Sequence, residues 1–172
     1  MGPPRSLGVV TPTEVISSPR LTLTPLAAGD AAEMLEVLSD PSLYEFTGGE
    51  PPTLGSLSEL YAFQTAGSPR EDETWHNWVM RLGDSAIGYV QATVIADAAE
   101  MAWVVGIGWQ GRGYAIEAAR SMRDWLALRG ATQFTAHIHP DHGASKAVAR
   151  ALGLDETGRL DEEGEMIWAS GE

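Results

Sequence analysis

Apolar and polar residues alternate in several short stretches of the chain, and alternation with a period of two is typical of β-strands. Such stretches, rich in β-branched and aromatic residues, occur at 20–24, 75–82, 86–95, 100–105, 133–138, 154–158 and 166–169. Gly83 and Asp84, between the second and the third, are a typical hairpin signal. The pattern predicts about seven strands.

Other segments place apolar residues three and four positions apart, which is the spacing of one helix face. They cover residues 30–38, 56–65, 114–128 and 144–152. The first two begin on capping-box patterns, because Asp30 and Ser56 are followed three residues later by glutamates. The third has the most regular apolar face and ends at Gly130, a residue type that favours helix C-termini. The sequence therefore predicts about four helices.

The order of these elements favours one α/β (α+β) domain, with a mixed, mostly antiparallel sheet flanked by helices. A length of 172 residues suits a single domain with its own core. Residues 1–18 are rich in proline, glycine, serine and threonine and lack periodicity. We therefore expect a flexible N-terminal arm at 1–18 and the domain at 19–172.

Composition excludes several classes of function. The chain has no cysteine, which rules out disulfides, thiolate metal sites and a cysteine nucleophile. Its net charge of −13 argues against nucleic acid as a partner and fits a cationic ligand, although acidity also serves solubility. No secretory leader is visible, and the apolar region at 86–109 is interrupted by Gln91, Asp97 and Glu100. We expect a cytoplasmic protein without a membrane partner.

A glycine-rich loop lies between a predicted strand and the longest predicted helix. That order leaves backbone N–H groups free at the positive end of a helix dipole, where phosphate binds. A nucleotide P-loop is excluded, because Gly113 is followed by Tyr114 and Ala115 instead of lysine and serine or threonine. Gly106, Gly108 and Gly111 match the G-x-G-x-x-G spacing of a dinucleotide-binding site. The late position of the loop in the chain nevertheless disfavours such a site.

Four separated motifs favour a third phosphate ligand. The loop at 110–115 reads Q-G-R-G-Y-A, and residues 103–105 before it read W-V-V. Residues 141–145 and 152–154 read D-H-G-A-S and L-G-L, and residues 20–23 read R-L-T-L. Together they resemble the GNAT family of N-acetyltransferases, and the first strand resembles its ribosomal-protein-alanine N-acetyltransferase subgroup. The chain departs from the family pattern at Ile107, His142 and Leu154, and no tyrosine follows Ser145.

The resemblance implies acyl-CoA-dependent N-acylation, with acetyl-CoA as co-substrate and no metal cofactor. The acceptor would be a primary amine of a small molecule or a peptide N-terminus, attacking the thioester directly. The resemblance also implies that a strand N–H at Val105 faces the developing negative charge and that Ser145 protonates the leaving thiolate. The implied coenzyme-binding residues are Trp103, Val104, Val105, Gln110, Gly111, Arg112, Gly113, Tyr114, Ala115, His142 and Ser145.

An ammonium acceptor must lose a proton before it attacks, so a base is needed. Glu100, at the entry of the strand before the loop, is the first candidate. His76, His137 and Glu165 are the alternatives, on or near neighbouring strands. Aromatic faces can hold a cation, and the aromatic candidates for the acceptor pocket lie near the helix carrying Tyr61: Tyr44, Phe46, Trp75 and Trp78.

Two other functions remain open at this point. The string His137-x-His139-x-x-His142 resembles metal-hydrolase motifs, but few residues follow it and the only other histidine, His76, precedes it. A catalytically silent acyl-CoA-binding module would share the same loop. Domains of the family often pair, so a homodimer is one expected assembly.

Overall fold

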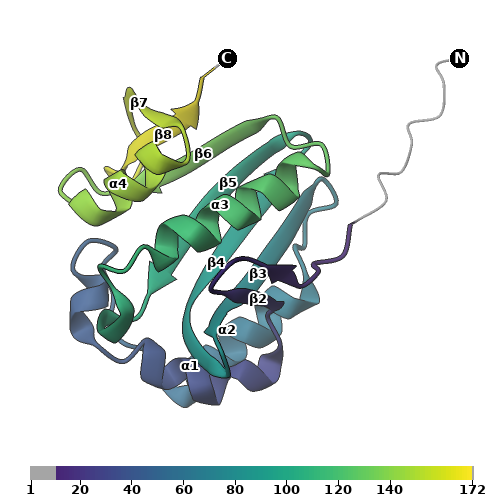
Figure 1. Cartoon of the computed structure of the whole chain (residues 1–172), viewed down its shortest axis with the longest axis vertical. Coiled ribbons are helices and arrows are strands. Elements are labelled where there is room, and N and C mark those ends of the chain that lie inside the picture. Colours follow the sequence, from purple (N-terminus) through teal and green to yellow (C-terminus); the bar gives the residue numbers. More distant parts are fainter. Residues whose placement is uncertain (1–10, 172) are drawn as a thin grey trace, which may run out of the picture.

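One eight-stranded sheet runs through residues 11–171, the part of the chain that the computed structural model describes (Figure 1). Its order is β1-β2-β3-β4-β5-β6-β8-β7, and every neighbouring pair is antiparallel except β5 and β6. The strands are β1 (Ile16–Ser17), β2 (Thr22–Pro25), β3 (Glu73–Leu82), β4 (Ser85–Ile95), β5 (Ala98–Val105), β6 (Gln133–Ile138), β7 (Leu154–Leu160) and β8 (Met166–Ser170).

Helices cover both faces of the sheet. The α-helices are α1 (Ala31–Val37), α2 (Leu54–Ala66), α3 (Tyr114–Ala127) and α4 (Gly143–Ala151). Short 3₁₀ helices are η1 (Ala28–Asp30), η2 (Pro41–Tyr44) and η3 (Ile107–Trp109). Helices α1 and α2 pack on one face, and α3 crosses the other (Figure 1). None of the helices in the described residues is long and apolar enough to cross a membrane.

Strand alternation divides the core between these two faces. Trp78 and Met80 of β3 belong to the core under α3 and α4, whereas Val79 between them belongs to the core under α1 and α2. Phe134 and Ile138 of β6 also face α3 and α4. Residues at the intervening positions of β5 and β6 therefore face the α1 and α2 side of the sheet, which becomes important for the site.

Strands β5 and β6 separate after a short parallel contact. They pair only at 98–100 with 133–135, although β5 continues to Val105 and β6 to Ile138. Beyond Glu100, β5 stays paired with β4, and β6 stays paired with β8. The sheet thus splits into two arms, and the backbone edges that face each other across the split are available to a ligand.

Gly88 permits the close approach of β4 and β5 at the end of this split. An added Cβ there would lie 2.2 Å from the backbone oxygen of Val104. The next rung is closed by the Gly106 N–H, which donates to the oxygen of Ile87 at 2.8 Å. The β4 side of the split is therefore held tightly up to the point where β5 ends.

The predicted mixed, mostly antiparallel sheet with four α-helices is confirmed, with eight strands where the pattern predicted about seven. The additional strand is β1, within the segment expected to be an arm. In that segment Thr13 bonds His76, and the oxygen of Glu14 accepts from the Trp78 indole at 2.7 Å. Residues 1–10 of the expected arm lie outside the described residues.

Two predicted helix caps are wrong in detail. Helix α1 has no side-chain cap, and Glu33 accepts from the Ala86 N–H and pairs with Arg81 instead of reaching back to its own helix. The second capping box is formed by Thr53 and Ser56, so α2 begins earlier than expected.

Candidate active site

A groove of about 790 Å³ follows the split in the sheet. Its walls come from β5 and the end of β6, and its ends come from the first turns of α3 and α4. The loop at 42–47, between α1 and α2, borders it from the other face. Five segments, from residue 42 to residue 148, therefore meet around one hollow, which is the size expected for a small-molecule site.

The glycine loop before α3 presents free backbone donors to this groove. Gly111 and Gly113 have φ of 76° and 80°, a conformation that favours glycine. Gly113 is the N-cap of α3 and brings no side chain to cap the helix. The first N–H to bond back within the helix is that of Glu117, to the oxygen of Gly113 at 3.1 Å. The preceding N–H groups are the natural contacts for an anion at a helix N-terminus.

Arg20 braces this loop from the first strand region. Its Nη1 donates to the oxygen of Arg112 at 2.9 Å, and its Nε donates to Glu117 at 2.7 Å. The guanidinium also lies 4.6 Å from the centre of the Tyr114 ring. Sequence reasoning used Arg20 only as part of a motif, because nothing local indicates that it reaches a loop some ninety residues further on.

The end of β5 directs a backbone N–H toward the split. The oxygen of Val105 accepts from the Gln110 side chain at 2.9 Å. The Gly106 N–H donates to Ile87 on β4, so the adjacent pair of Val105 and Gly88 is a non-hydrogen-bonded one, and the N–H and C=O of Val105 point away from β4. In an extended strand the N–H and C=O of one residue point to the same side, and alternate residues point alike. The N–H groups of Val105 and Trp103 therefore face the groove, where they can donate to a carbonyl oxygen.

The first turn of α4 forms the opposite end of the groove. Ser145 lines the groove and is partly exposed. His142 is the N-cap residue, and the Phe46 ring stacks on it with 4.5 Å between ring centroids. Burial lowers the pKa of His142, and neighbouring His139 lowers it further. His142 is therefore a neutral imidazole near neutral pH.

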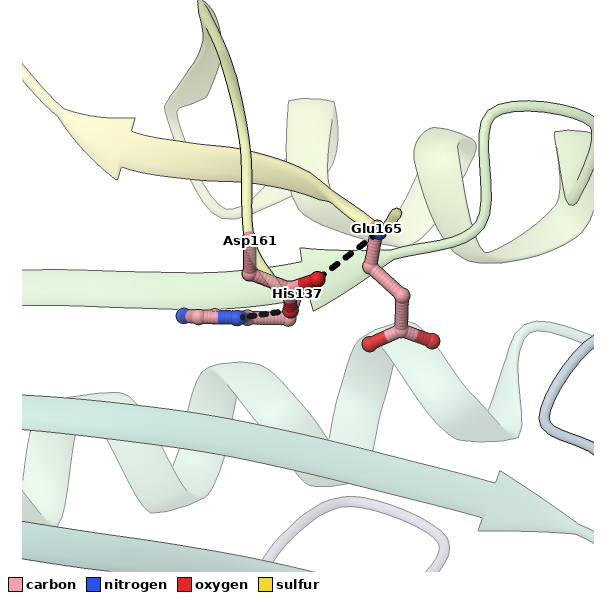
Figure 2. Close-up of side chains that lie close together, drawn as sticks. All are labelled: His137, Asp161 and Glu165. Carbon is pink, nitrogen blue, oxygen red and sulfur yellow. Dashed lines mark hydrogen bonds and ion pairs between the residues drawn. The ribbon is translucent and has the colours of Figure 1, made fainter. Parts of the chain in front are cut away.

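A hydrogen-bonded group of titratable side chains lies where the two arms diverge (Figure 2). The Nδ1 atom of His137 lies 2.7 Å from Asp161 Oδ2. On the other side of the ring, Nε2 lies 3.8 Å from a carboxylate oxygen of Glu100. Figure 2 shows the Glu165 carboxylate extending away from this hydrogen bond. Glu100, His137 and Glu165 all line the groove.

Two carboxyl groups of the β7–β8 turn, those of Asp161 and Glu165, have opposite pKa shifts. The hydrogen bond from His137 lowers the pKa of Asp161, and backbone N–H donors lower it further. Burial raises the pKa of Glu165, and the charges of Asp161 and Glu163 raise it too. The site thus has one firmly ionised carboxylate behind the imidazole and a second carboxylate that a bound cation would help to ionise.

The side chains of His137, Asp161 and Glu165 offer ligand atoms within 4.8 Å of one another, which is close enough to hold a metal ion. Their hydrogen bonds already use both oxygens of Asp161, one for His137 and the other for the N–H groups of Glu163 and Glu165. The three histidines of the sequence motif have different partners: His137 bonds Asp161, His139 accepts from the Asp141 N–H, and His142 stacks on Phe46. We therefore assign no metal to this group.

A second hollow of about 400 Å³ adjoins the groove on the α1 and α2 face. Its lining is largely apolar, and three phenol rings face it: Tyr44, Tyr61 and Tyr89. Tyr44 donates to the oxygen of Leu38 at 2.8 Å, and burial raises the pKa of Tyr89 to about 12. The two hollows share Leu43, Thr47, Tyr89, Gln91 and Val104. A ligand body seated here would lie beside the groove.

The structure brings most of the predicted site residues to the groove. Those that line it are Phe46, Glu100, Trp103, Val104, Val105, Gln110, Gly111, Gly113, Tyr114, Ala115, His142 and Ser145, with the alternative bases His137 and Glu165. Tyr44 lines the second hollow. Arg112 contributes its backbone oxygen to Arg20, and its side chain is not among the lining residues.

Three aromatic or basic candidates do not line the groove. Trp75 packs against Phe63 and donates to Glu73, away from both hollows. Trp78 borders the second hollow but is fully buried in the core, beside Trp125. His76 is 4% exposed, belongs to the same aromatic cluster and lines neither hollow. Asp161 and Arg20 are the contributors that sequence reasoning did not assign to the site.

Comparisons with known proteins agree with this architecture. A family model for the acetyltransferase (GNAT) domain matches residues 20–155. Among solved structures, the chain is similar to an acetyltransferase from Agrobacterium tumefaciens, with 24% identity and a TM-score of 0.73 over 96% of this chain and 98% of that one. A search of curated proteins finds no match.

Two further structures of that fold contain ligands. RimL, a ribosomal L7/L12 alpha-N-protein acetyltransferase in complex with coenzyme A, is 16% identical, with a TM-score of 0.77 over 91% of this chain and 97% of that one. The microcin C7 self-immunity acetyltransferase MccE, in complex with acetyl-CoA and AMP, is 16% identical, with a TM-score of 0.75 over 94% and 97%. At these identities the likeness shows the fold.

Proposed function

The chain belongs to the GNAT family of acetyltransferases, and we propose that it transfers an acyl group from acyl-CoA, most simply acetyl-CoA, to a primary amine. The acceptor would be a small molecule or a peptide N-terminus. The observation that carries this proposal is the conjunction of a split sheet with a free helix N-terminus at one end of the split.

The backbone donors at one end of the groove suit the diphosphate of the co-substrate. The diphosphate would lie on the backbone N–H groups of 111–115, where the two left-handed glycines bring the chain close and add no side chain. The rest of the arm would lie along the free edge of β5, between Trp103 and Val105. When bound, acyl-CoA supplies an acyl group that is already activated as a thioester.

Backbone groups and side chains of this chain would then perform three tasks. The N–H of Val105, with that of Trp103 on the same strand edge, stabilises negative charge on the thioester oxygen. A base from the neighbouring pair of Glu100 and His137 removes the proton of the amine. Ser145, across the groove in the first turn of α4, donates a proton to the leaving sulfur.

The acceptor side of the site combines an apolar hollow with negative charge. Tyr44 and the other phenols would contact an apolar body, and Phe46 covers the groove from the loop before α2. Glu100 and Glu165 make the region beside the split anionic, which suits an amine that arrives as an ammonium ion. RimL, whose name states that it acts on a ribosomal protein N-terminus, has this fold, which keeps a peptide terminus among the candidates.

Thiol release tests the proposal. The full chain is mixed with acetyl-CoA and each member of a panel of primary amines and short peptides, and free thiol is followed with a chromogenic disulfide. We expect release that depends on both substrates and a product heavier by one acetyl group. The control is Gly113→Trp, which fills the diphosphate cradle beside Arg20 and should abolish both binding and release.

The rival proposal is a silent acyl-CoA-binding module. It predicts calorimetric binding of acetyl-CoA by the wild-type chain without thiol release for any amine. Absence of both binding and release would refute the enzyme and the module together.

A further inference from the structure

We propose that His137, oriented by Asp161, is the group that takes the proton from the attacking amine, and that Glu100 and Glu165 draw the amine to it as a cation. This assignment rests on the proposed acyl transfer and replaces the first sequence-based candidate for the base, Glu100.

The strand register places His137 at the reacting end of the split. Glu100 pairs with Thr135, the last pair before the strands diverge, so His137 is level with Ala102 on the opposite arm. Trp103, whose N–H faces the groove, is the next residue along. Because Phe134, Ala136 and Ile138 face α3 and α4, the side chain of His137 lies on the other face of the sheet, with Glu100. An amine entering from the α1 and α2 side therefore meets this imidazole beside the thioester site.

Hydrogen bonds within the β7–β8 turn hold the Asp161 carboxylate in position beside the His137 ring. Its Oδ1 accepts from the N–H groups of Glu163 and Glu165, both at 2.9 Å. Its own N–H donates to the oxygen of Glu165 at 2.8 Å, which closes the turn between β7 and β8. Its Oδ2 is left to accept from His137 Nδ1 at 2.7 Å. An ionised carboxylate only accepts, so Nδ1 carries the hydrogen and the lone pair of neutral His137 is on Nε2.

The surroundings of Nε2 favour a cation as the incoming group. Glu100 faces it from β5 at 3.8 Å, and Glu165, in the turn that precedes β8, lies on the Asp161 side of the ring (Figure 2). Asp161 lies behind Nδ1, and Glu163 in the turn and His139 just after β6 are the further charged or titratable groups that act on Glu165. Carboxylates thus surround an imidazole whose basic nitrogen opens to the groove.

The proton balance of the step is simple. The ammonium ion first gives one proton to solvent and becomes the neutral amine. As its nitrogen bonds to the acyl carbon, His137 Nε2 takes a second proton from that nitrogen, and the C–S bond breaks with its electron pair on sulfur. Ser145 gives its hydroxyl proton to the sulfur, and His137 returns its proton to Ser145 through solvent. The products are the amide, the free thiol and one proton in solution.

Two substitutions separate this role from simple packing. His137→Gln removes the base, and we expect kcat/KM to fall at least about 100-fold, the lower range for general base catalysis. Asp161→Asn keeps an oxygen for the turn but presents an NH₂ group to Nδ1, which moves the ring hydrogen to Nε2. We expect a comparable loss, while acetyl-CoA affinity stays within about threefold. The matched control, Asp155→Asn, changes an exposed aspartate of β7 and should leave the rate unchanged.

The pH profile gives a readout that packing would not move. Wild-type kcat/KM should rise with pH for two reasons, because both a general base and the amine must be unprotonated; in His137→Gln only the rise set by the amine's own pKa should remain, which amines of different pKa identify. A His137→Gln variant with a rate within about threefold of the wild type and the same pH profile for every amine overturns the proposal.

The tautomer can be measured without any turnover. Nitrogen-15 NMR of the histidine rings should find the hydrogen of neutral His137 on Nδ1 in the wild type and on Nε2 in Asp161→Asn. A wild-type ring with its hydrogen on Nε2 refutes the orientation, whatever the enzyme assay gives. If no amine releases thiol, the proposed function fails and this proposal fails with it; if thiol is released at the wild-type rate by His137→Gln, only the assignment of the base fails.

Discussion

Replacing Gly88 with alanine tests whether the β4–β5 contact holds the reacting backbone in place. The new Cβ would lie 2.2 Å from the Val104 oxygen, and the obstructing atom is backbone that cannot rotate away. An ordinary contact is about 3.5 Å, so the two strands must separate by about 1 Å. Overpacking of this kind costs about 1–3 kcal/mol, and a backbone obstruction places Gly88→Ala near the upper limit.

That cost converts to a measurable change in melting temperature. For a domain of this size, each kcal/mol lowers Tm by about 2–4 °C, so we expect a fall of about 6–12 °C by circular dichroism. The same displacement moves Val104 and Val105, so kcat should fall more than acetyl-CoA affinity.

The matched control is Gly108→Ala. An added Cβ at Gly108 meets nothing within 4 Å, and its backbone is not left-handed. We expect its stability to stay within about 1 kcal/mol of the wild type. A Gly88→Ala variant as stable and as active as the control would refute the close contact and the role given to it.

Three other predictions concern the loop, the acidic group and the far side of the sheet. Arg20→Ala should weaken acetyl-CoA binding, measured by calorimetry, about threefold to tenfold. Arg20→Lys should restore little of that affinity, because an ammonium group cannot make all the contacts of the guanidinium with Arg112, Glu117 and the Tyr114 ring. An Arg20→Ala variant with wild-type affinity would refute the proposed support of the loop by Arg20. Glu100→Gln should raise KM for cationic amines more than it weakens acetyl-CoA binding, and an unchanged KM would remove Glu100 from the acceptor site. The Ala86 N–H, and then Arg81, lower the pKa of Glu33, so its stabilising contribution is complete above the ordinary glutamate value of 4.5 and is lost as pH falls through the lower folded value. Urea unfolding of Glu33→Gln should therefore show lower stability than wild type near neutral pH, with a difference that shrinks in acid; a difference that grows in acid would contradict the assignment.

Local patterns were sufficient to predict the elements and the cofactor loop. The strand at 133–138 and the start of α3 at Tyr114 lie where periodicity predicts them, because one face of each is buried in a continuous core. The glycine loop is also local: a strand, two left-handed glycines and a helix start follow one another in sequence. Such features need no knowledge of the rest of the fold.

Contacts between distant segments could not be predicted in this way. Asp161 and His137 are 24 residues apart and meet only because β8 lies between β6 and β7 in the sheet. Trp75 and Trp78 have similar neighbours in the sequence, yet Trp75 packs against Phe63 of α2, whereas Trp78 lies in the core under α3. The split between β5 and β6 is not visible in local patterns, since β6 keeps the alternation of an ordinary strand and β5 is apolar at every position after Glu100.

A crystal structure of the full chain with acetyl-CoA tests the central claim most directly. The account predicts the diphosphate on the N–H groups of 111–115, the arm of the coenzyme between β5 and β6, and the thioester oxygen within hydrogen-bond distance of the N–H of Val105 or Trp103. A diphosphate bound elsewhere, or an arm that lies outside the split, would contradict it.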